Sequence, residues 1–221
     1  MPQPSKELEK SCRTYARLME EIKRRHSVIA QVLNQTIPMP QMAAFEFCYL
    51  QLRKTCEVFA LACLAAHGDI PEVRSKLLQK TYSADQIMKQ LTLIHPEFYP
   101  APSKQTVDQV TQKPIEVTAI TTGFSTKDEL LTLYGECGNY LHRGTIRQLL
   151  GKWEPTLDFD KITAWISKIV TLLNHHQIQT SQENRQIWFL MNADDQRVHW
   201  SIMEKLAADD PRIPRGGFNV G

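Results

Sequence analysis

Residues 41–67 read QMAAFEFCYLQLRKTCEVFALACLAAH. This pattern predicts one helix that is apolar almost all the way round, and such a helix lies in the middle of a bundle where other helices cover it. Within it, Arg53 and Glu57 stand one helical turn apart, so they can form an ion pair on one face. The pair is either a structural clamp or part of a functional site, because both uses place charges in a helical core.

The composition indicates a globular protein with one sizeable core. The chain has 221 residues, of which 42% are hydrophobic and 23% are charged, and its net charge is +2. That charge is too close to balance to indicate nucleic-acid binding by itself. The uncharged run from Val58 to Ala66 is far shorter than the roughly 20 residues of a membrane span, so we expect no membrane association.

Cysteine and histidine spacings predict neither a disulfide framework nor a metal site. The five cysteines, an odd number, form no CxxC pair, and the histidines lack HExxH spacing. His175 and His176 are adjacent, so on a helix they would point to different faces. The N-terminus MPQPSKELEKSC lacks the apolar region of a secretory signal. We therefore predict a cytoplasmic protein with buried, reduced thiols and no cofactor.

Further helices are predicted around the central one. A seam of apolar residues at alternating steps of three and four runs from about Ser5 to Gln35 and includes His26, which we interpret as a packed histidine. Short helices are expected at 72–80 and from Ser83, where Ser83 and Gln86 form a capping box. Two more begin at Ser125, which is capped together with Asp128, and at Asp158.

Two segments break the helical pattern. Prolines interrupt residues 96–124, where short strands are expected at 107–110 and 115–120; this inserted arm either clasps a second subunit or lies on its own bundle. A β-hairpin is predicted from the alternating runs 187–192 and 197–204. The predicted fold is therefore mainly α, an up-down helical bundle over 1–180 with a small inserted β arm. Residues 181–221 add the C-terminal β-hairpin and a tail.

The candidate functional residues surround the sequence GNYLHRG at 138–144. Histidine is the usual proton carrier near neutral pH, so His142 is a candidate acid–base group, with Arg143 and Glu57 as catalytic partners. Arg53, Asn139 and Tyr134 are the candidate binding residues. The alternative is a polar cluster that only fixes the register of the helices, since no nucleophile is obvious nearby.

The spacing LRxxxE on a core helix followed by GNxxH at the end of another resembles the HEPN class of all-helical domains over about residues 45–176. That resemblance implies a homodimeric helical bundle of bacterial defence or stress systems. Active members are metal-independent ribonucleases with an arginine four to six residues before the histidine. Here those positions hold Glu136, Cys137 and Gly138.

Three hypotheses follow from these patterns. The first is a non-catalytic homodimer that binds RNA, a nucleotide or a protein partner. The second is a divergent metal-independent ribonuclease that uses His142. The third is a purely structural protein-interaction module, in which the arm and the C-terminal hairpin bind another chain.

Overall fold

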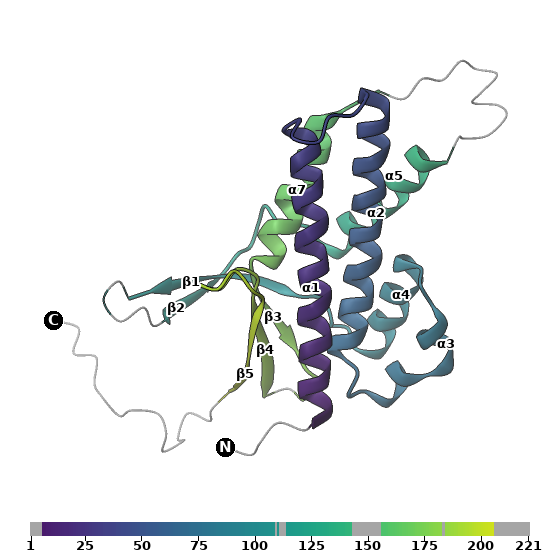
Figure 1. Cartoon of the computed structure of the whole chain (residues 1–221). Coiled ribbons are helices and arrows are strands. Elements are labelled where there is room, and N and C mark those ends of the chain that lie inside the picture. The colour runs from purple at the N-terminus through teal and green to yellow at the C-terminus, as the bar shows by residue number, and fades with distance from the viewer. Residues whose placement is uncertain (1–5, 109, 111–113, 143–155, 183, 206–221) are drawn as a thin grey trace.

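The computed structural model describes residues 6–108, 110, 114–142, 156–182 and 184–205 (Figure 1). Helix α1 (Lys6–Leu33) and helix α2 (Gln41–Ala66) lie side by side along most of their length and run in opposite directions. Buried residues occur on every side of α2, as its composition predicted, and the apolar seam of α1 is buried too. The prediction of a central helix covered by other helices is confirmed.

The remaining helices pack around this pair. The short helices η1 (Pro71–Arg74) and α3 (Lys76–Lys80) follow α2, and α4 (Ala84–Ile94) and α5 (Lys127–Leu141) both pack on α2. Helix α7 (Phe159–Leu173) lies behind α1 in Figure 1 and leads directly into the sheet. In the described part of the chain, no helix is both long enough and apolar enough to span a bilayer.

The strands form one antiparallel sheet of five strands in the described residues, in the order β2-β1-β3-β4-β5. Its members are β1 (Ala101–Val107), β2 (Pro114–Ala119), β3 (His175–Gln179), β4 (Arg185–Leu190) and β5 (His199–Glu204). The prediction of a mainly α bundle with a separate small arm and hairpin is therefore wrong, and the fold is α+β. The arm (β1 and β2) and the C-terminal hairpin (β4 and β5) belong to the same sheet because β3 pairs with both β1 and β4.

Strand β3 is the element that the sequence analysis missed. Residues 175 and 176 were placed on a helix, but they begin β3, where His176 and Ile178 alternate inward and are buried. The sequence HHQIQ has period 2, which is hard to see directly after the apolar residues that end α7. The predicted strand at 107–110 was also displaced, since β1 begins at Ala101 although it contains Pro102.

The inner face of the sheet packs on the N-terminal half of α1 (Figure 1). The ring of Tyr15 in α1 packs at a tilt against that of Phe189 in β4, with ring centroids 4.3 Å apart. Its hydroxyl donates to Nε2 of His176 over 2.8 Å, and Nδ1 of that histidine donates to the carbonyl oxygen of Leu173 over 2.8 Å. The side chains of Tyr15 and His176 are fully buried. The hydrogen bonds just described give their polar atoms the partners that buried polar groups need.

Helix capping agrees with the sequence at one of three predicted positions. Asp158 caps α7 by accepting from the amide of Lys161 over 2.9 Å. The cap of α5 lies one residue later than expected, because Thr126 and Glu129 form the capping box. Ser83 precedes α4, but its hydroxyl bonds to Asp85 rather than to the helix amides, so the capping box predicted there is wrong.

Candidate functional site

The predicted ion pair between Arg53 and Glu57 forms on α2. Arg53 Nε lies 3.4 Å from Glu57 Oε1, and the ammonium group of Lys54 lies 2.8 Å from the other carboxylate oxygen. The carboxylate is therefore shared by two cations. Two positive groups and one negative group leave the cluster with a net charge of +1, so it can still attract an anion.

The Arg53 guanidinium lies between α2 and α5. Its Cζ is 4.5 Å from the centroid of the Tyr134 ring, and Nη2 donates to the Tyr134 hydroxyl over 3.2 Å. A Cβ atom placed on Gly138 would come within 3.3 Å of Nη1, so a glycine at this position gives the guanidinium its room. Stacking on an aromatic ring fixes the plane of the guanidinium and stabilises it by cation–π attraction.

The apolar sequence of α2 suggested that this cluster lies in the most buried part of the core. In the structure it lies at the edge of the core. The side chain of Arg53 is 27% exposed and that of Glu57 is 16% exposed. Both groups are therefore partly hydrated, which lowers the cost of holding charges there. Partial exposure also leaves the guanidinium accessible to a ligand from solution.

His142 extends this surface along α5, whereas Asn139, the residue after Gly138, lies about 100° further round the helix. His142 is the residue that follows the last turn of α5, its amide bonds to the carbonyl oxygen of Gly138, and it is exposed, as is Asn139. A step of four residues from Gly138 places His142 on the side of α5 that Arg53 contacts. Among the described residues, no hydrogen bond or ion pair joins His142 to Arg53 or Glu57. Arg143 lies outside the described residues.

The cysteines nearest to this surface are not activated. Burial raises the pKa of the Cys137 thiol to about 12, although the Arg53 charge acts in the opposite direction. Burial likewise raises the pKa of Cys56 well above its ordinary value. All five cysteines are buried and unpaired by disulfides, as predicted. A thiol with a raised pKa stays protonated near neutral pH, so these two do not supply a nucleophile.

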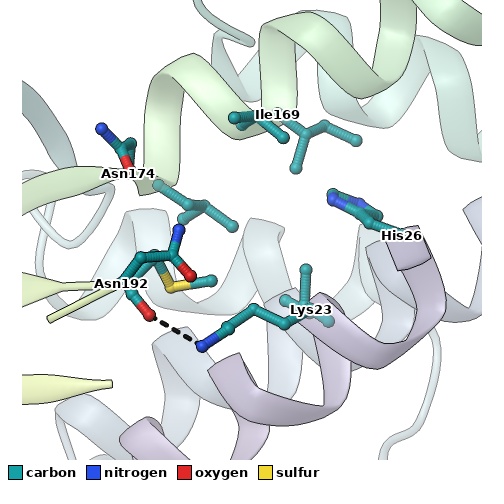
Figure 2. A pocket seen from close by; sticks show the side chains of 9 residues that line it. Lys23, His26, Ile169, Asn174 and Asn192 are labelled. Carbon is teal, nitrogen blue, oxygen red and sulfur yellow. Dashed lines mark hydrogen bonds between the residues drawn. The ribbon is translucent and has the colours of Figure 1, made fainter. Parts of the chain in front are cut away.

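A second candidate site lies between α1, α7 and the end of β4, and the sequence analysis did not predict it. It is a cavity of about 240 Å³, shown in Figure 2. Its lining residues are Ile22, Lys23, His26, Ile169, Val170, Leu173, Asn174, Met191 and Asn192. The imidazole of His26 points towards this cavity (Figure 2), and burial lowers its pKa to about 4.

The partly buried His26 differs in its bonding from the buried histidines. Its Nε2 is shielded from solvent and has no hydrogen-bond partner among the described residues. His67, in contrast, faces two carbonyl oxygens, those of Cys63 and Gln179. The only sequence signal for the cavity was a histidine on an apolar seam. It does not show whether a neighbouring helix covers the ring.

Metal binding finds no support in the described residues. They contain no group of three or more histidine, cysteine, aspartate or glutamate side chains arranged to hold a metal ion. The adjacent histidines of β3 are hydrogen-bonded to other side chains of the protein. His175 Nδ1 lies 2.7 Å from the Ser103 hydroxyl, and His176 is bonded to Tyr15.

No family model matches the chain, and neither a curated protein nor a solved structure matches it at a significant level. The resemblance to the HEPN class thus stays a prediction from two short motifs.

Proposed function

We propose that Arg53, Tyr134 and His142 form a surface, here called the α2–α5 surface, that binds phosphate groups of RNA without cleaving the chain. The observation that carries this proposal is the partly exposed Arg53 guanidinium, stacked on Tyr134 and held by Glu57. A guanidinium fixed in one plane loses little entropy when it binds a phosphate, and its fork of N–H donors matches phosphate oxygens.

The donors around this guanidinium support an anionic ligand. Nε faces Glu57 and Nη2 donates to Tyr134, and among the described residues no acceptor is bonded to Nη1. Lys54 adds a second cation, 48% exposed, on the same turn of α2. The exposed imidazole of His142 is a further hydrogen-bonding group at the end of α5. The tyrosine ring and the two motifs shared with the HEPN class favour RNA over other phosphate compounds.

The same geometry argues against cleavage by a single chain. General acid–base catalysis requires a base held within hydrogen-bond reach of its partners, and His142 has no described bond that orients its ring. Glu57, which the sequence analysis named as a catalytic partner of His142, is bonded to Lys54 and Arg53 instead. The neighbouring thiols are protonated. These observations support binding as the role of this surface.

We also propose that the protein acts as a homodimer and that the arm contributes to the contact. Val107, Val110 and Ile115 at the far end of the arm are 42%, 90% and 67% exposed. Figure 1 shows this hairpin extending away from the helices. Apolar side chains gathered at the end of a hairpin are suited to an interface. Light scattering at micromolar concentration should give twice the chain mass, and the double substitution Val110→Asp and Ile115→Asp should give the monomer.

Fluorescence anisotropy with a labelled single-stranded RNA in EDTA tests the main proposal. We expect saturable binding by the wild type, weakened about tenfold or more by Arg53→Gln, because a charged hydrogen bond is worth about 1.5–3 kcal/mol. Arg13→Gln is the matched control, since Arg13 is an exposed arginine of α1 that pairs with Glu9. Equal affinities of the two variants would contradict the proposal, and so would the absence of binding by the wild type.

The divergent ribonuclease is the competing outcome of the same experiment. After incubation, the RNA should remain intact on a denaturing gel. Cleavage in EDTA that disappears in His142→Ala, while the circular dichroism spectrum is unchanged, would replace the binding proposal by the ribonuclease.

A further inference from the structure

We propose that the cavity between α1, α7 and the end of β4 binds a small, neutral, mainly apolar molecule that carries one hydroxyl group. The proposal is independent of the α2–α5 surface. It stands on three observations: the size and lining of the cavity, the unpaired nitrogen of His26, and the fully compensated charge of Lys23.

The size and lining of the cavity define the body of the ligand. Its volume is about 240 Å³, and most of its wall is apolar, from Ile22 of α1, Ile169 and Leu173 of α7, and Met191. An engineered cavity of about 150 Å³ with a similar lining in another protein binds benzene. The present cavity therefore has room for a single substituted aromatic ring, and apolar walls favour such a ring over a sugar or a peptide.

His26 defines the polar group of the ligand. Its Nε2 has no hydrogen-bond partner among the described residues and is shielded from water. A buried polar atom without a partner is unfavourable, so a ligand that supplies the partner gains binding free energy. The imidazole needs only to turn about χ2, which is a broad torsion, for Nε2 to face the cavity. A hydroxyl suits either tautomer because it both donates and accepts.

Lys23 determines the charge of the ligand. Its ammonium group has three donors, and they face the carbonyl oxygens of Met191 and Gln196 and the carboxylate of Glu20. Figure 2 shows this amine turned towards the chain after β4. Since the charge of Lys23 is already compensated and His26 is neutral near pH 7, the cavity has no unpaired cation for a carboxylate or a phosphate. An anionic ligand is therefore disfavoured.

The rim gives the ligand its entry. Asn174 and Asn192 are exposed residues on one side of the cavity, and Val170, 46% exposed, lies on α7 at its mouth. The site thus has a polar rim of two amide side chains and an apolar interior, which fits a molecule with an apolar ring and one polar group. Val170 is also a position where a larger side chain closes the mouth without disturbing the buried core.

Fluorine NMR with 4-fluorophenol and fluorobenzene tests the proposal, because the two compounds differ only in the hydroxyl group. For the wild-type chain we expect saturable binding of 4-fluorophenol with a Kd on the order of 1 mM. Fluorobenzene should bind about tenfold more weakly, because it leaves Nε2 unpaired. Equal affinities for the two compounds, or no saturation by 4-fluorophenol, would overturn the proposal.

Two variants and a control locate the binding. His26→Phe should remove the difference between the two compounds, and Val170→Trp should weaken both, while His199→Phe on exposed β5 should change neither. If His26→Phe does not fold, the proposal is still tested by Val170→Trp and by the affinities of the wild type for 4-fluorophenol and fluorobenzene. Binding that is unchanged by Val170→Trp would place the compounds elsewhere and refute the site.

Discussion

Replacing Tyr15 by phenylalanine tests how the sheet is fastened to the helices. The Tyr15 hydroxyl donates to His176 Nε2 over 2.8 Å, and both side chains are completely buried. The substitution keeps the ring that packs on Phe189 and removes only the hydroxyl, so it opens little space. It leaves a buried nitrogen without a partner, at a cost of about 1–3 kcal/mol. For a chain of this size a loss of 2 kcal/mol lowers Tm by about 4–8 °C.

Urea denaturation followed by circular dichroism at pH 7.5 measures this loss. Tyr82→Phe is the matched control, since Tyr82 is 79% exposed and the same change there should stay within about 0.5 kcal/mol. If Tyr15→Phe and Tyr82→Phe have the same free energy of unfolding, the buried hydroxyl does not secure β3 to α1, and the interpretation of this contact is wrong.

Three other predictions concern stability and reactivity. Burial lowers the pKa of His26 and of His176 from 6.5 to about 4. The unfolded chain therefore binds more protons between these values. The free energy of unfolding should be highest above about pH 6.5 and should fall as the pH drops towards 4; urea midpoints that do not change over this range would contradict it. Thr126→Ala removes the capping box with Glu129 and should cost about 1 kcal/mol, whereas Thr163→Ala within α7 should cost less in the same urea titration. Because all five thiols are buried, the native protein should react with a thiol reagent only as fast as it unfolds; a fast phase without denaturant would refute that burial.

The helices were predictable because their signals are local. The apolar seam of α1, the all-round apolar surface of α2 and the Asp158 cap of α7 depend on residues a few positions apart. Strand β3 was not, because HHQIQ becomes a strand by pairing with β1 and β4, which lie far away in the sequence. Tertiary pairing decides such short segments, and a period of two over only five residues is too weak a local signal to identify one.

The candidate site was predictable to a similar extent. The spacing of Arg53 and Glu57 predicted their contact, since four residues make one helical turn. The stacking on Tyr134 and the space above Gly138 depend on how α5 crosses α2, which spacing does not give. The cavity beside His26 likewise depends on α7, because the residues of α7 that line it lie more than 140 positions further along the chain.

The salt dependence of RNA affinity tests the central claim most directly, because it counts phosphate contacts. For single strands, each neutralised phosphate adds about −0.7 to the slope of log K against log salt concentration. The slope for Arg53→Gln should therefore be shallower than that of the wild type by about this amount, and the slope for Arg13→Gln should not change. Identical slopes for wild type and Arg53→Gln would show that the guanidinium on Tyr134 touches no phosphate.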